Sequence, residues 1–269
     1  MPHHSTYSIW NVLRILICAF AVIYLVGPIV VVVIISFSAA PFLMFPPPGY
    51  SLRWYDKLFG DPVWRDALFT SIRIMIPTAL LATAAGTAAA YGFARARFRG
   101  STALSALMLT PIVVPVIITA AGMFGVFQDF NLYGTWTGLI LAHTVLAMPY
   151  VFVTVSAGLR VIDPVLEAAA MTLGAPPRVA FFRVVLPLIK PAIQSGLLFA
   201  LVVSFDEVIV SLFISTPRIR PVSVQMWSDV LGQVDPTIAA VATLLLAFST
   251  LVVVVEYLVR KGRPVTPGA

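Results

Sequence analysis

Few side chains in this 269-residue sequence could perform covalent or metal chemistry, and none stands in a common catalytic motif. The histidines are His3, His4 and His143, the single cysteine is Cys18, and neither an HExxH nor a CxxC pattern occurs. None of the three lysines follows a glycine, as a Walker-type phosphate loop requires. The sequence therefore predicts no catalytic residue, no metal site and no cofactor bound by this chain. We expect His143 to be a hydrogen-bonded packing residue.

Two adjacent carboxylic acids, Asp206 and Glu207, interrupt an otherwise apolar segment over about residues 192–214. Ionisable groups within a membrane-spanning helix are costly and usually face a cavity or a partner. On a continuous helix Ser204, Glu207 and Ser211 share one face, and Asp206 lies about 100° away around the axis. We predict these four residues as candidates for the pathway of a cationic solute. Pairing with arginine, or hydrogen bonding across a subunit interface, explains the two acids equally well.

The polar and proline-rich segment 160–191 predicts an elbow of two helices. Asp163 is a good N-cap, Pro164 suits the first helical position, and Gly174 can end the helix in a left-handed conformation. Two consecutive prolines follow shortly, and a second helix is expected to start there and to end before Pro187. The first helix carries more apolar side chains than a free loop of this size needs, which predicts a face buried against a partner. These side chains are Val165, Leu166, Ala169, Met171 and Leu173.

The composition predicts that most of the chain lies in lipid. Hydrophobic residues make up 60% of the chain and charged residues 10%, with a mean hydropathy of +0.99, whereas soluble domains are nearer half apolar and a quarter charged. A helix needs about 20 apolar residues to cross the hydrocarbon core, and continuous rather than alternating runs favour helices over barrel strands. The predicted fold is therefore an all-α, polytopic membrane protein with one transmembrane domain over residues 1–269. Its six spans are expected at about 15–35, 74–93, 103–128, 136–159, 192–214 and 237–257.

Lysine and arginine are distributed unevenly between the two sets of loops, and basic loops resist translocation. With a cytoplasmic amino terminus, eleven of the 17 basic residues lie inside and six outside. Both termini and the 160–191 elbow are therefore predicted to be cytoplasmic. The net charge of +6 sits at membrane boundaries, whereas nucleic-acid binding needs a clustered basic face. Lipid is thus an expected partner, and nucleic acid is not.

Other patterns predict how the spans pack and bend. Small residues recur from Ala82 to Ala90, which lets a second helix approach closely. Pro111 and Pro115 in the third span and Pro149 in the fourth each remove a backbone donor, so both spans are expected to bend. In the predicted outer loop, Trp54, Tyr55 and Trp64 are expected to anchor the chain at the membrane interface, and docking of a partner is the alternative.

The elbow resembles the EAA loop of the permease subunits of type I, binding-protein-dependent ABC importers. The resemblance rests on the Glu-Ala-Ala run at 167–169, on Gly174, and on the Leu-Pro pair at 186–187. The spacing and the position after the fourth of six spans also agree with that family. Two residues depart from its pattern: Pro176 stands where a small polar residue is common, and Val184 replaces isoleucine.

This resemblance implies that the elbow is a coupling helix, which inserts into a groove on a separate ATP-hydrolysing subunit. Glu167 would contact that subunit or cap the elbow, and Gly174 would permit the sharp turn. The residues expected to couple to the ATPase are Glu167, Ala168, Ala169, Gly174, Ala175, Arg178, Leu186 and Pro187. ATP and Mg²⁺ would bind to the ATPase, and this chain would be a non-catalytic subunit.

The resemblance also implies an assembly and a substrate class. The assembly would hold a second, homologous but different permease subunit, two ATP-binding subunits and a periplasmic or lipid-anchored binding protein, in a bacterial inner membrane. The segments 48–55, 95–100 and 204–211 resemble the spermidine/putrescine permeases, in particular their second permease subunit. A small cationic substrate such as a polyamine is therefore expected. Relatives that carry other amines, opines, phosphonates or ferric ions share parts of these segments.

A stand-alone, ion-coupled secondary transporter or channel is the competing class. In that case Asp206 and Glu207 would carry protons or sodium ions. No convincing repeat relates the two sets of three spans, so an inverted-repeat transporter receives no support from the sequence. Transport by the purified chain alone would favour this class, and recovery of an ATPase with the chain would favour the importer.

Overall fold

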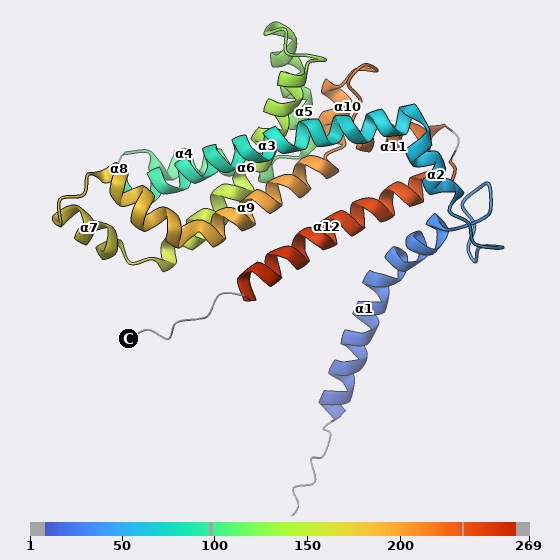
Figure 1. Ribbon diagram of the computed structural model, residues 1–269, viewed down its shortest axis with the longest axis horizontal. Helices are drawn as coiled ribbons and strands as arrows, with labels where there is room; N and C mark the ends of the chain where they lie inside the picture. The colour runs from blue at the N-terminus through green and yellow to red at the C-terminus, as the bar shows by residue number, and fades with distance from the viewer. Residues whose placement is uncertain (1–8, 97–98, 233, 262–269) are drawn as a thin grey trace, which may run out of the picture. The chain divides into compact units, whose positions relative to one another are not determined.

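The computed structural model describes residues 9–96, 99–232 and 234–261, and their regular structure is helical (Figure 1). Within these residues the only β pairings are two isolated bridges, Ser38 with Tyr50 and Thr216 with Ile219, so the all-α prediction is confirmed. Five helices are long and apolar enough to cross a membrane, and a sharply bent pair makes a sixth if it counts as one span.

The chain divides into two units. The first unit consists of residues 1–61 and 229–246, and the second of residues 62–228 and 247–269. The prediction of one domain over the whole chain therefore stays a prediction. The first unit holds α1 (Ile9–Ser36), α2 (Arg53–Gly60) and the first part of α12 (Thr237–Lys261).

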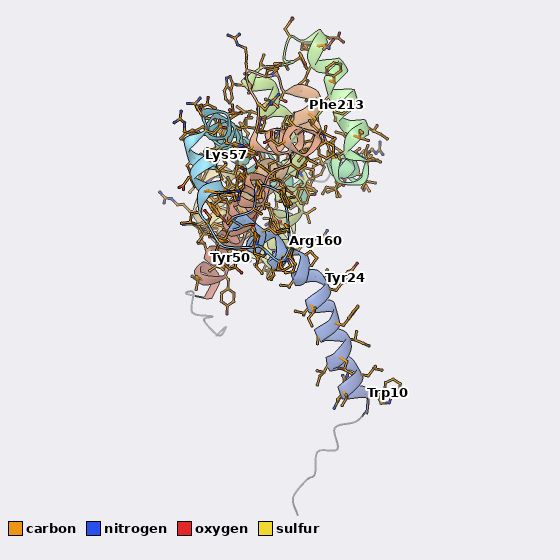
Figure 2. The ribbon with its side chains drawn as sticks, turned by 90° about the vertical axis from the view of Figure 1, so that its right-hand side faces the viewer. Trp10, Tyr24, Tyr50, Lys57, Arg160 and Phe213 are labelled. Atoms are coloured by element: carbon orange, nitrogen blue, oxygen red, sulfur yellow. The ribbon has the colours of Figure 1, made fainter. Side chains whose placement is uncertain are left out.

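In the first unit, α1 is apolar over its whole circumference and its side chains stand out on every side. Figure 2 shows Trp10 and Tyr24 projecting from it, with 70% and 71% of their surfaces exposed. The segment between α1 and α2 is closed by the Nε1 atom of Trp54, which donates a hydrogen bond of 2.7 Å to the Ser38 carbonyl. Trp54 is buried, so its predicted role as an interface anchor is wrong. The expectation failed because this ring fills the inside of its own loop.

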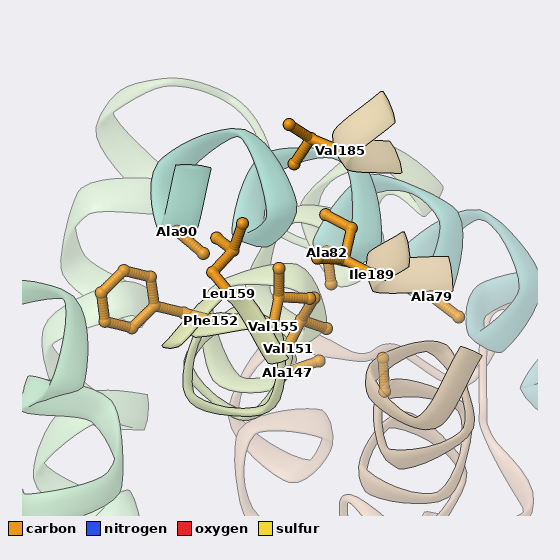
Figure 3. Close-up of a cluster of buried hydrophobic side chains, with 11 residues drawn as sticks. Ala79, Ala82, Ala90, Ala147, Val151, Phe152, Val155, Leu159, Val185 and Ile189 are labelled. Carbon is orange, nitrogen blue, oxygen red and sulfur yellow. The ribbon is translucent and has the colours of Figure 1, made fainter. Parts of the chain in front are cut away.

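The second unit is built on three long helices that pack on one another, namely α3 (Pro62–Arg95), α6 (Trp136–Val161) and α9 (Leu186–Asp206). Their buried apolar side chains form the cluster in Figure 3, which includes Ala79 and Ala82 from α3 and Val151 and Val155 from α6. Trp64, also in this unit, is buried within the protein and not placed as a membrane anchor. The other helices of the unit are α4 (Ser101–Val113), α5 (Val116–Asp129), α7 (Pro164–Thr172), α8 (Pro177–Ala180), the π-helix η1 (Phe181–Val185), α10 (Ile209–Ile214) and α11 (Val222–Leu231), whose last residues belong to the first unit.

Glycine lets the three central helices approach closely. A Cβ atom on Gly86 of α3 would lie 2.8 Å from the Cβ of Val151, and one on Gly196 of α9 would lie 3.1 Å from Cγ1 of the same residue. Val151 therefore fills the space that two glycines leave open. The small-residue pattern over 82–90 correctly predicted this close packing.

The third predicted span is broken. Helices α4 and α5 meet at Pro115 with a bend of 106°, and α5 packs against α10 instead of continuing the line of α4. Pro111 is accommodated within α4, whereas Pro115 has a non-helical conformation just before α5. The predicted bend is thus confirmed at Pro115, where the missing backbone donor falls at a helix start.

Proline does not end the helix that returns from the elbow. A continuous helical path runs through α8, η1 and α9, so the expectation that it ends before Pro187 is wrong. The Leu186 amide donates to the Phe181 carbonyl, five residues back, and this wider π turn directly precedes the proline. A π turn shifts the carbonyl with which the proline ring would otherwise clash, so the chain passes Pro187 without a break.

Candidate functional site

The first helix of the elbow begins and ends at the residues that the sequence predicted. The Asp163 side chain accepts a hydrogen bond of 2.9 Å from the Val165 amide, and Pro164 occupies the first position of α7. Gly174 ends the turn with a φ of +92°, and its amide donates to the Met171 carbonyl at 3.0 Å. Residues with a side chain rarely adopt that φ, so glycine is the residue that suits this position.

Helix α7 and the residue that follows it, Leu173, expose apolar side chains over most of their surface. Val165 and Leu173 are 64% and 89% exposed, and Leu166 and Met171 are exposed with them. Among the residues predicted for coupling, Ala168, Ala169, Gly174, Arg178 and Pro187 are exposed, and Ala175 and Leu186 are partly buried. We call Val165, Leu166, Met171 and Leu173 the elbow face. In Figure 1, α7 and α8 project from one end of the α3, α6 and α9 bundle, which we call the elbow end.

Glu167 does not lie on the elbow face. Its residue is only 6% exposed, and its carboxylate accepts hydrogen bonds from Arg95 Nε, at 2.6 Å to Oε2, and from the Tyr91 hydroxyl to Oε1. Both donors belong to the last turns of α3. The Tyr91 ring also packs on Phe181, with ring centroids 4.5 Å apart. Glu167 therefore ties the elbow to α3 inside the same chain.

Sequence reasoning missed Tyr91 and Arg95 as partners of the elbow. They stand four residues apart and so share one face of α3, which was the available signal. Glu167 lies more than 70 residues further along the chain, and nothing local indicates that it meets this face.

Asp206 and Glu207 lie where two helices meet. Helix α9 ends at Asp206, Glu207 is extended, and α10 begins at Ile209. The Glu207 side chain accepts from the Val210 amide at 2.8 Å, and its carbonyl accepts from the Ser223 hydroxyl at 2.8 Å. Glu207 thus caps α10, whereas Asp206 is exposed at the carboxyl end of α9. The two acids therefore differ in role.

His143 joins the two sides of this break. It is buried, and its Nδ1 lies 3.1 Å from the Ser204 carbonyl and 3.0 Å from the Ser204 hydroxyl, while Nε2 lies 2.9 Å from the Ser211 hydroxyl. A carbonyl oxygen only accepts, so Nδ1 carries a proton and donates. The structure bears out the prediction of a hydrogen-bonded packing residue. Ser204 and Ser211 converge as expected, but they point at His143, and Glu207 does not share their face because the helix is broken.

Residues 82–262 match the family of binding-protein-dependent transport system inner membrane components. The chain belongs to this family. The matched region contains the elbow, the α9 to α10 break and the last part of α3. The chain is accordingly a multi-pass membrane protein and a permease subunit of an ABC importer, and the stand-alone transporter receives no support.

Named relatives are similar over most of the chain. The putrescine transport system permease protein PotI of Escherichia coli (strain K12) is 35% identical over 87% of this chain and 85% of its own length. The spermidine/putrescine transport system permease protein PotC of Haemophilus influenzae is 32% identical over 88% of this chain and 92% of its own.

A solved structure shares the fold. A chain of a bacterial ABC transporter involved in the import of the acidic polysaccharide alginate aligns with a TM-score of 0.68. The alignment covers 98% of this chain and 100% of that one, at 15% identity. At this identity the likeness concerns the fold alone.

Proposed function

We propose that this permease subunit imports a small cationic solute of the polyamine class, and that a separate ATPase drives it through the elbow. The observation that carries the proposal is the elbow face, an apolar surface on a short helix that is fastened to the bundle by Glu167. In this proposal the elbow and both termini are cytoplasmic. ATP and Mg²⁺ bind to two partner subunits, and a second, homologous permease and a binding protein complete the importer.

The elbow face suits a groove on a protein partner. Leu173 and Val165 are large apolar side chains at the tip of a projecting element, and burial of each would contribute about 1.5–3 kcal/mol. Because Glu167 is already paired within the chain, its proposed part in coupling is to transmit displacement to α3 and not to contact the ATPase.

The substrate class rests on Asp206 and on the names of the relatives. Asp206 is exposed, and the last carbonyl groups of α9 add partial negative charge at the same helix end. A polyamine cation fits both features, and the relatives above carry putrescine or spermidine in their names. We propose Asp206 as the residue that faces the solute. The break between α9 and α10 is then stabilised by the hydrogen bonds of Glu207, Ser204 and Ser211.

Uptake into proteoliposomes tests the substrate and the energy source. Liposomes that hold the four kinds of subunit should take up labelled putrescine with ATP and not without it. Asp206→Asn should lower uptake at least tenfold without changing subunit co-purification. Asp129→Asn, which alters another exposed acid at the end of α5, should leave uptake unchanged. Full uptake by Asp206→Asn would remove this residue from the pathway.

Co-purification of the ATPase tests the elbow face. Leu173→Glu should abolish recovery of the ATPase with this chain, because a carboxylate would replace an apolar contact. Val161→Glu, at an equally exposed position outside α7, should retain it. Normal recovery with Leu173→Glu would refute docking through this face.

A further inference from the structure

A cavity of about 740 Å³ lies at the elbow end of the second unit, between α3, α4, α6 and the start of α7. Its polar lining includes two arginines, Arg95 and Arg160, and the hydroxyl residues Ser101, Ser105 and Ser156. Aromatic and aliphatic side chains, such as Phe152 and Leu109, form the rest of its wall. No acidic residue is among the described residues that line it. The cavity is therefore basic at one part and apolar at another.

Arg95 has a donor that lacks a partner. Its Nε is bound to Glu167, but its Nη2 atom is buried and has no hydrogen-bond partner within the described part of the chain. A buried guanidinium nitrogen without an acceptor costs free energy, and native proteins rarely leave one unpaired. Nη2 itself is closed off from solvent, so Arg95 lines the cavity with the part of its side chain that is exposed and contributes its positive charge there.

Arg160 adds a second positive charge. It is exposed at the end of α6, and neither of the two ion pairs found among residues 9–96, 99–232 and 234–261 includes it. Glu167 offsets Arg95, so the lining keeps a positive charge that no described carboxylate balances. Two guanidinium groups and several hydroxyls are the donor set that binds phosphate oxygens well.

We propose that this cavity binds the headgroup of an anionic phospholipid. The cavity lies at the ends of helices that span the membrane, where headgroups are concentrated, and basic pockets between such helices are suited to them. The phosphate accepts from Arg160 and from the hydroxyl groups of the lining, beside the positive charge of Arg95, and the apolar wall accommodates the first part of an acyl chain. The proposal rests on the membrane location of the chain and not on its solute.

The bound lipid has a consequence for the elbow. Arg95 donates to Glu167 through Nε and also lines the cavity, so a phosphate beside its guanidinium restrains the side chain that fastens α7 to α3. An anionic lipid therefore stabilises the packing of α7 against α3 within the chain. A membrane that lacks anionic lipid leaves the Arg95 side chain less restrained.

Lipid titration of the full chain in detergent tests the site. Palmitoyl-oleoyl phosphatidylglycerol should raise the melting temperature and appear as a retained adduct in native mass spectrometry, and the matching phosphatidylcholine should do neither. Arg160→Gln should weaken phosphatidylglycerol binding about fivefold, whereas Arg160→Lys keeps most of it. Arg183→Gln removes an exposed charge that does not line the cavity and should leave binding unchanged.

Four results would overturn the proposal. Equal protection by phosphatidylcholine would show that the headgroup charge is not recognised. If Arg160→Gln and Arg183→Gln weakened phosphatidylglycerol binding equally, the effect would come from the overall charge and not from this cavity. Full protection by inorganic phosphate at the same concentration would assign the site to a free anion, and displacement of the lipid by the ATPase would assign it to that subunit. Loss of transport with intact lipid binding would contradict the proposed function and leave this site standing.

Discussion

Replacing Glu167 by glutamine perturbs the contact that fastens the elbow to α3. Removal of one partner from a fully buried ion pair costs about 3–5 kcal/mol, whereas an exposed pair contributes about 0–1 kcal/mol. The Glu167 and Arg95 side chains are 8% and 24% exposed, so this pair lies between those limits but nearer the buried one. We expect Glu167→Gln to destabilise the contact between α7 and α3 by about 2–2.8 kcal/mol. Because 1.4 kcal/mol corresponds to a tenfold change, the elbow should open roughly 30- to 100-fold more often.

Hydrogen–deuterium exchange of the full chain measures this opening. Amides of α7 should exchange roughly 30- to 100-fold faster in Glu167→Gln, while those of α6, which is packed in the bundle, should not change. Arg178→Gln removes an exposed charge from the same elbow and serves as the matched control. The exchanged pair Glu167→Arg with Arg95→Glu should recover part of the protection. Unchanged exchange of α7 in Glu167→Gln would refute the fastening role.

Three other predictions concern stability, each followed by thermal unfolding in detergent. Gly86→Ala should lower the free energy of unfolding by about 1–3 kcal/mol, because its Cβ would lie 2.8 Å from a carbon of α6. Gly92→Ala, where the added Cβ meets open space, should not destabilise the protein. Equal melting temperatures of the two variants would contradict this. His143→Phe should cost about 2 kcal/mol, since two serine hydroxyls lose a partner, and a wild-type melting temperature would oppose it. Burial raises the pKa of Asp235, but hydrogen bonds from Lys57 and a neighbouring threonine outweigh it and lower the pKa overall. A carboxyl with a lowered folded pKa stabilises above its unfolded pKa and loses this effect as pH falls through the folded value. Asp235→Asn should therefore cost about 0.5–1 kcal/mol at neutral pH and nothing in strong acid; a pH-independent difference would be inconsistent with the ion pair.

The elbow shows how far local chemistry predicts structure. The cap at Asp163, the proline after it and the turn at Gly174 act within a few residues, and all three work in the structure as the sequence indicated. The direction of the Glu167 side chain depends on α3, which the sequence places far away. Its position in the motif indicated that it matters, but only the packing shows with which residues it pairs.

Proline and periodicity failed where the helix departs from regular α geometry. The expectation of an end before Pro187 assumed a four-residue turn, and the π turn η1 removed the clash on which that expectation rested. The common face of Ser204, Glu207 and Ser211 likewise assumed a continuous helix. The break after Asp206 turns Glu207 into a cap, while His143 brings the two serines together by hydrogen bonds instead of helical spacing.

Three connections join the elbow to the bundle, and together they determine how a displacement of the elbow is transmitted. Two are covalent: residues 162–163 join α6 to α7, and α8, η1 and α9 form one helical path from the elbow into the bundle. The third is the contact of Glu167 with Tyr91 and Arg95, which reaches α3. Because α3 and α9 both pack on α6 with little free space at Gly86 and Gly196, neither helix can move closer to α6 without a clash at Val151. Force applied to α7 therefore reaches α6 and α9 through the chain and α3 through Glu167. Loss of the Glu167 contact leaves only the covalent connections to α6 and α9, so in the proposed assembly closure of the ATPase would displace α3 less.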